Sequence, residues 1–122
     1  MHHVRGGDIV KRGDIWLVNL DPTLGHEIKK SRPAVIIQND LGNKYSSITI
    51  IAPITSQGLD KIYPIEVELK RRHGLDKDSK ALLNQIRAID KKRLIKKLSR
   101  IDEFELQEID EAIKISLGLV KF

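Results

Sequence analysis

AVIIQNDLGNKYSSITIIAPI, residues 34–54, decides the fold, because it places two β-branched runs on either side of a short polar stretch. Residues 34–38 and 47–54 are rich in isoleucine and valine, which is typical of buried strands. Between them, residues 39–43 hold asparagine, aspartate and glycine, the residue types that favour turns. The stretch therefore predicts two strands separated by a turn.

Further strands are expected on both sides of this pair. Residues 13–20 read GDIWLVNL and end at an Asp-Pro dipeptide, and residues 64–69 alternate apolar side chains with glutamate, as in a strand with one wet face. Residues 79–89 fit either a strand or a helix by periodicity, and their place after four short strands favours a strand. Residues 90–93 predict a short helical turn, and residues 94–101 a last strand.

The chain is expected to end in an amphipathic helix. Asp102 and Glu105 have the spacing of a capping box, and we expect about 17 helical residues after it. One face would hold Phe104, Leu106, Ile109, Ala112, Ile113, Ser116 and Leu117. Five or six short strands and one helix form a flat sheet only with long open edges, so a curled, partly closed barrel capped by the helix is expected.

The composition is that of one soluble domain. The 122 residues are 40% hydrophobic and 32% charged, which is enough for a single core. No apolar run reaches the roughly 20 residues that cross a bilayer, and the N-terminus lacks the apolar segment of a secretory signal. The absence of cysteine excludes disulfides and thiolate metal sites. We expect a cytoplasmic protein with one domain over residues 1–122, of which 1–9 are flexible or partly added in cloning.

The charge is distributed unevenly along the chain. Residues 61–100 carry 13 basic and 5 acidic side chains, whereas residues 101–122 carry 2 basic and 6 acidic ones. A basic middle beside an acidic end suggests a polyanion or an acidic peptide as a partner. A lysine-rich surface that only keeps the protein soluble is the alternative, because few aromatic side chains are present to stack bases.

Familiar cofactor chemistry is absent from the sequence. The four histidines, His2, His3, His26 and His73, do not pair with another ligand at metal-binding spacing. No glycine-rich phosphate loop and no nucleophile elbow is present. We therefore expect neither a metal nor a cofactor.

Two residues at strand ends draw attention. Arg32 precedes a proline, which drives its backbone toward extended geometry and restricts the direction of the guanidinium, so Arg32 is suited to hold a phosphate. Thr55 ends the strand over residues 47–54. Each has an ordinary alternative: a surface ion pair for Arg32, and a hydroxyl that caps a turn for Thr55.

Four blocks of the sequence resemble the MazF/PemK family of toxin endoribonucleases from bacterial toxin–antitoxin pairs. They are RGDIWLVNLDPTLGHEIKKSRPAVIIQND (12–40), IIAPITSQ (50–57), LLNQIRAIDKKRL (82–94) and the final amphipathic helix. The resemblance runs from residue 10 to residue 122. It implies a mainly β fold, a small SH3-like barrel of the MazF/CcdB type with a C-terminal amphipathic helix, a homodimer, and metal-independent cleavage of single-stranded RNA at a short sequence.

The resemblance also assigns roles to single residues. Arg32 and Thr55 fall where the family keeps its catalytic arginine and threonine; Arg32 would hold the phosphate and is a candidate proton donor to the leaving group, and Thr55 would donate to a phosphate oxygen. Glu27 is the candidate base, with an ion pair to a loop lysine as its alternative. His26 competes for that role because imidazole titrates near neutral pH.

Other residues are expected to bind the RNA. The candidates are Lys29, Lys30, Ser56, Gln57 and Gln85. Trp16 and Tyr45 are candidates to stack a base, with core packing favoured for the tryptophan. The expected partner is an antitoxin with an acidic, partly disordered C-terminal segment. The alternative function is that of a CcdB-like toxin, which binds DNA gyrase without being an enzyme; the ending LGLVKF lacks the Trp-Gly-Ile type of ending expected for it.

Overall fold

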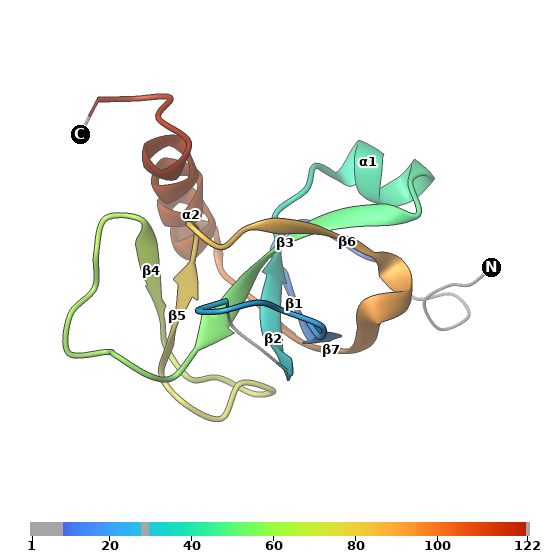
Figure 1. The fold of residues 1–122 in the computed structure, drawn as a ribbon, viewed down its shortest axis with the longest axis horizontal. Helices are drawn as coiled ribbons and strands as arrows, with labels where there is room; N and C mark the ends of the chain where they lie inside the picture. The colour runs from blue at the N-terminus through green and yellow to red at the C-terminus, as the bar shows by residue number, and fades with distance from the viewer. Residues whose placement is uncertain (1–8, 28–29, 122) are drawn as a thin grey trace.

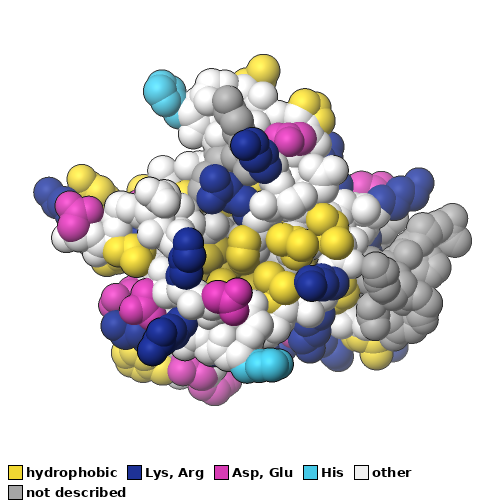
Figure 2. Space-filling model, turned by 90° about the horizontal axis from the view of Figure 1, so that it is seen from below, with side chains coloured by type: hydrophobic (Ala, Val, Ile, Leu, Met, Phe, Trp, Pro, Cys, Tyr) yellow, Lys and Arg dark blue, Asp and Glu magenta, His cyan; other side chains and the backbone are white. Residues whose placement is uncertain are grey.

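The computed structural model describes residues 9–27 and 30–121, which form seven strands and three helical segments (Figure 1). In chain order the elements are β1 (Asp14–Asn19), β2 (Ser31–Ile36), α1 (Asp40–Tyr45), β3 (Ile48–Thr55), β4 (Glu66–Leu69), β5 (Ser79–Leu82), β6 (Arg87–Asp90), the 3-10 turn η2 (Lys91–Arg93), β7 (Leu94–Arg100) and α2 (Glu103–Ser116). From below, the surface shows a hydrophobic area with Lys and Arg side chains spread around it (Figure 2).

The strands form one antiparallel sheet with β3 at its branch point. The order is β4-β5-β3-β2-β1-β7, and β6 also pairs with β3. β2 therefore occupies one edge of β3, while β6 and then β5 share the other edge. Among the described residues no ladder joins β4 to β7, so the sheet is an open path. A closed SH3-like barrel remains a prediction.

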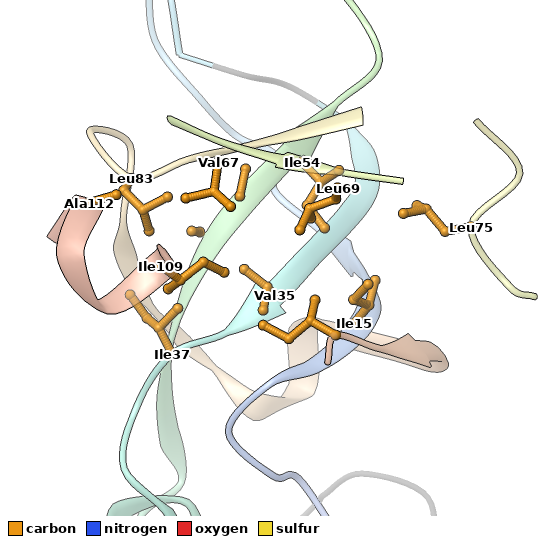
Figure 3. Close-up of a cluster of buried hydrophobic side chains, with 13 residues drawn as sticks. Ile15, Val35, Ile37, Ile54, Val67, Leu69, Leu75, Leu83, Ile109 and Ala112 are labelled. Carbon is orange, nitrogen blue, oxygen red and sulfur yellow. The ribbon is translucent and has the colours of Figure 1, made fainter. Parts of the chain in front are cut away.

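Alternate side chains of the central strands point into two hydrophobic cores on opposite faces of the sheet. One face holds Ile15, Val35, Ala52 and Ile54 together with Ile109 of α2 (Figure 3). The helix α2 thus covers this first core. The opposite face holds the second core, which consists of Val10, Trp16, Val18, Leu20, Ala34, Ile36, Ile51, Ile89 and Leu94.

The second core settles the ordinary role of Trp16. Its side chain is fully buried, and its indole Nε1 has no hydrogen-bond partner among the described residues. Stacking on a nucleobase requires an exposed ring face, so core packing, the favoured interpretation, is confirmed. Tyr45 is 74% exposed at the end of α1, and its ring lies under the Lys44 ammonium.

The turn predicted over residues 39–43 is wrong, because α1 begins there. The Asn39 side chain accepts a hydrogen bond from the backbone N–H of Gly42 and so caps the helix. Asn43 is buried, accepts from the Thr49 hydroxyl at 2.7 Å and donates to the Gln38 carbonyl at 3.0 Å. The polar residues that suggested a turn are therefore the cap and the anchor of a short helix.

The strand favoured over residues 79–89 is present in part. β5 and β6 lie within it, but a turn interrupts them, since the Gln85 N–H donates to the Leu82 carbonyl. Because of this interruption, β5 pairs with the end of β3 and β6 pairs with the beginning of β3. The predicted helical turn before β7 is confirmed as η2.

The capping box of α2 is confirmed, since the side chains of Asp102 and Glu105 each accept from the other residue's backbone N–H. The helix has 14 residues, fewer than predicted. The assignment of two residues to its buried apolar face is wrong: Phe104 is 68% exposed, and Leu117, just beyond the helix, is 55% exposed. Arg72 pairs with the carboxylate of Glu105 through both terminal nitrogens, which ties the helix to the β4–β5 loop. No described helix is both long and apolar enough to cross a membrane.

Candidate functional site

Sheet register brings Arg32 and Thr55 onto the same face. The β2–β3 ladder ends with Ala34 opposite Pro53, so these two residues share a face of the sheet, and Arg32 and Thr55, each two residues beyond that pair on its own strand, lie on the same face. Directly opposed residues of antiparallel strands share a face, with Cβ atoms about 4.5–5.5 Å apart. On the other side of β2, Arg32 is paired with Val18 of β1. Two residues 23 positions apart in the sequence thus share one face, Arg32 near the start of β2 and Thr55 at the end of β3.

Arg32 is held by the strand on which it lies. It is the second residue of β2, in extended geometry as its proline neighbour predicts, and its side chain is half-buried. A guanidinium in that position starts from a fixed backbone and projects from the face that also carries Thr55. Such an arrangement is suited to a two-pronged hydrogen bond to phosphate oxygens.

Thr55 ends β3, and its hydroxyl has a defined partner. The Thr55 Oγ1 accepts from the Gln57 backbone N–H at 3.1 Å, and the residue is 8% exposed. The turn-capping alternative for this hydroxyl is therefore present in the structure. This bond uses only the oxygen of Thr55 as an acceptor, so the hydroxyl keeps its own hydrogen and can still donate it to a ligand. The same turn orients Ser56, half-buried, and Gln57, exposed.

The loop between β1 and β2 carries the candidate bases. His26 and Glu27 are both exposed, and a Glu27 carboxylate oxygen accepts from the Leu24 backbone N–H within the loop. Lys30 is exposed and has a φ of 68°, an uncommon left-handed conformation. Lys29 lies outside the described residues. The loop thus presents both candidate bases, His26 and Glu27, beside the cation Lys30.

A cleft of about 410 Å³ lies beside this loop. Its lining residues are Leu20, Glu27, Pro53, Asn84, Gln85, Ile86 and Arg87. Two predicted features meet here, the loop acid Glu27 and the RNA-binding candidate Gln85, together with Pro53, which lies two residues before Thr55 on the same face of β3. His26, Arg32 and Thr55 are not among the lining residues. The mixture of apolar walls and polar groups suits a small ligand or a nucleobase.

Arg87 belongs to this site, and the sequence did not single it out. It pairs with Ile51 across β3 and β6, which places it on the same face as Pro53 and Thr55. It lines the cleft, and its guanidinium donates to the Leu20 carbonyl at 3.1 Å. The sequence favoured one strand over residues 79–89 and did not predict the turn after Leu82, so the new strand that begins at Arg87 was not foreseen.

Much of the basic middle of the chain holds the fold together. The Lys80 ammonium, in a residue only 6% exposed, donates to the carbonyls of Gly58 and Lys61 and to the Glu66 carboxylate. It therefore pins the loop that follows Thr55. Lys91 donates to a carbonyl of α1, and its burial lowers the pKa of its ammonium group.

Metal ligands are not clustered in the part of the chain that the structure describes. Across residues 9–27 and 30–121, no three His, Asp or Glu side chains are gathered as a metal ion would need. The chemical groups of the site are a guanidinium, a hydroxyl, a carboxylate and amides. This set can bind an anionic ester, stabilise added negative charge on it and accept a proton.

Comparison with known proteins gives the family. The family model described as PemK-like, MazF-like toxin of type II toxin-antitoxin system matches residues 11–117. The chain is 44% identical over 115 residues to the endoribonuclease EndoA of Bacillus subtilis, which covers 93% of the chain and 99% of EndoA. It is 50% identical over 116 residues to the endoribonuclease MazF of Staphylococcus epidermidis, covering 93% of the chain and 96% of that protein.

Solved structures agree with these relatives. The crystal structure of MazF from Deinococcus radiodurans has a TM-score of 0.78 and 26% identity, covering 91% of this chain and 98% of that one. MazF of the same organism has also been solved in complex with MazE; that structure shares 22% identity and a TM-score of 0.71, over 91% of this chain and 97% of that one. The mainly antiparallel sheet with a C-terminal helix is thus a MazF-like fold.

These matches agree with the nuclease prediction rather than with the gyrase-binding alternative, because both relatives are named endoribonucleases. They also cover nearly the whole described chain. The chain therefore belongs to the MazF/PemK family of endoribonuclease toxins from type II toxin–antitoxin systems.

Proposed function

We propose that this chain is the toxin of a toxin–antitoxin pair and cleaves single-stranded RNA at a short sequence without a metal ion. The 2′-hydroxyl oxygen attacks the adjacent phosphorus, the bond from phosphorus to the 5′-oxygen breaks, and the products carry a 2′,3′-cyclic phosphate and a 5′-hydroxyl. The observation that supports the proposal is the register of β2 and β3, from which Arg32 and Thr55 share the face that also carries Pro53, a residue of the cleft.

Arg32 and Thr55 act on the phosphate. The guanidinium holds a non-bridging oxygen and stabilises the charge that develops as the fifth bond to phosphorus forms. The Thr55 hydroxyl donates to a second oxygen while its own oxygen accepts from the Gln57 N–H. The departing 5′-oxygen takes a proton, for which Arg32 is the candidate donor.

Glu27 is the better placed of the two candidate bases. Its side chain lines the cleft, whereas His26 is not among the lining residues. A carboxylate there would accept the proton of the attacking 2′-hydroxyl. Replacing Glu27 with Gln keeps the size and the hydrogen bond to the Leu24 N–H but removes the base. Cleavage by that variant should be slow, while a His26→Gln variant should cleave normally.

Polar groups around the cleft select the RNA. Gln85 lines it, and Ser56 and Gln57 follow Thr55 in a turn whose geometry the threonine hydroxyl fixes. Amide and hydroxyl side chains of this kind read the edges of unpaired bases. Lys30, with Lys29 beside it in the sequence, supplies positive charge for neighbouring phosphates.

The direct test is cleavage of an RNA pool in excess chelator, with sequencing of the cut ends. One short motif, cyclic phosphate ends and loss of most activity in Arg32→Ala are expected, because that variant removes the group that neutralises the transition state. Arg71→Ala is a matched control, since Arg71 is an exposed arginine on the β4–β5 side. Full activity in Arg32→Ala, or a requirement for added metal, would overturn the mechanism.

We also propose a homodimer and an acidic antitoxin segment that competes with RNA for the cleft. Exposed apolar side chains support the dimer: Leu41 and Tyr45 on α1, Phe104 at the start of α2, and Leu117 and Leu119 after its end. Light scattering of the purified chain tests the dimer, and a monomeric mass would refute it. A negatively charged peptide that blocks cleavage without unfolding the toxin would support the antitoxin model.

A further inference from the structure

Three consecutive backbone carbonyls at the end of β1 each accept a hydrogen bond from a guanidinium. Arg93 Nη1 donates to the Asn19 carbonyl at 3.1 Å and to the Asp21 carbonyl. Arg87 Nη1 donates to the Leu20 carbonyl between them at 3.1 Å. Both arginines come from the segment around η2, more than 60 residues further along the chain.

These bonds extend the attachment of β1 beyond its regular pairing. The ladder between β1 and β7 ends at Val18 opposite Leu94, so Arg93 continues the contact where strand pairing stops. Arg87 does the same from the cleft side. The end of β1 is therefore fixed relative to β6, which contributes a wall of the cleft.

The residues fixed in this way form the base of the β1–β2 loop. The Leu20 N–H donates to the Lys30 carbonyl at 3.1 Å, and the Lys30 N–H donates to the Asp21 carboxylate at 2.9 Å. These two bonds close the loop that carries Glu27. The arginine contacts to Leu20 and Asp21 therefore also determine where Glu27 and Lys30 lie relative to the cleft.

We infer that Arg93 is a positioning residue: it binds the carbonyls of Asn19 and Asp21 and thereby places the β1–β2 loop over the cleft, and it does not bind RNA phosphate. This role rests on the proposed function for its effect on cleavage, but not for its effect on the loop. It also gives part of the basic middle of the chain a purpose other than electrostatic attraction. Arg93 is half-buried, as a residue inserted between two segments should be.

Two mechanisms for Arg93 predict different kinetics. A positioning residue acts on the chemical step, so Arg93→Gln should lower the single-turnover rate about 10- to 100-fold, as a misplacement of around 1 Å does. The affinity for an uncleavable RNA should hardly change. A phosphate contact would instead weaken RNA binding and reduce the slope of log affinity against log salt by about one.

Matched variants separate loss of charge from loss of the carbonyl contacts. Lys92→Gln removes the same charge from the same turn, at an exposed residue whose side chain makes no hydrogen bond to another described residue. It should cleave at about the wild-type rate. Arg93→Lys keeps the charge on a side chain that is one atom shorter and ends in a compact ammonium, so it should recover only part of the rate.

Amide hydrogen exchange tests the loop without reference to RNA. In Arg93→Gln the Leu20 and Lys30 amides, which close the loop, should exchange faster than in the wild type and in Lys92→Gln. Faster exchange without any RNA cleavage by the wild type would support the inference while defeating the proposed function. Unchanged exchange with an unchanged rate, or a lower salt slope with a normal rate, would overturn the inference. If Arg93→Gln does not fold, the same measurements on Arg93→Lys decide.

Discussion

Replacing Thr55 with Val removes one oxygen from the proposed catalytic pair and keeps the β-branched shape. The residue is 8% exposed, and its oxygen accepts only from the Gln57 N–H among the described residues. Loss of a donor aimed at transition-state charge costs about 100- to 1,000-fold in rate, or about 2.7–4 kcal/mol. Loss of the turn bond costs about 0.5–1.5 kcal/mol of stability. The cost should lie at the lower end of this range, because the exposed Gln57 N–H can form a hydrogen bond to water instead. The rate should therefore fall far more than the stability.

Single-turnover cleavage of a short RNA that contains the mapped motif, with enzyme in excess, measures the chemical step for Thr55→Val. Urea unfolding of the same preparation measures its stability. Thr55→Ser, which keeps the hydroxyl, is the control and should retain activity within about tenfold. A folded Thr55→Val enzyme that cleaves at nearly the wild-type rate would show that the hydroxyl does not touch the phosphate, and the shared face with Arg32 would lose its catalytic meaning.

Three further predictions concern stability and are measured by urea unfolding. Glu105→Ala removes the glutamate half of the capping box and the ion pair with Arg72, so the free energy of unfolding should drop by about 2–4 kcal/mol; a loss below about 1 kcal/mol would show that these bonds matter little. Asp40 accepts from the Arg12 backbone N–H, which lowers the pKa of its carboxyl from the ordinary 3.8. Its stabilisation is present above that ordinary value and is lost as the pH falls through the lowered one, so Asp40→Asn should flatten the acid decline and an unchanged decline would contradict this. Gly74→Ala should cost about 2 kcal/mol or more, because Gly74 has a φ of 89° and a Cβ there would lie 1.8 Å from a backbone oxygen of β7; near-normal stability would mean that the loop moves freely.

Local patterns predicted the regular elements well. The alternation over residues 64–69, the β-branched runs that became β2 and β3, and the capping box of α2 each report a local property of the chain, namely which face is buried or how a helix begins. Such properties do not depend on distant partners. α1 was missed because asparagine and glycine serve both turns and helix caps, and only the buried contacts of Asn43 decide between the two.

The site was predicted from the resemblance rather than from periodicity. Nothing local links Arg32 to Thr55, because their meeting depends on the register between β2 and β3. Arg87 was missed for the same reason, since its face follows from pairing with Ile51. The exposure of Phe104 depends on how α2 is rotated against the sheet, which helical spacing alone does not determine.

The alignment of β2 with β3 has a consequence for immature or damaged chains. Sliding one strand past the other by a single residue would turn every side chain of the moved strand to the opposite side, so Ala34 and Arg32 would exchange places with their neighbours at once. Such a chain would expose its apolar interior and separate the two groups that are proposed to act on the phosphate. If Arg32 and Thr55 act together as proposed, a misaligned chain would be unable to cleave RNA, so the activity would depend on correct strand alignment.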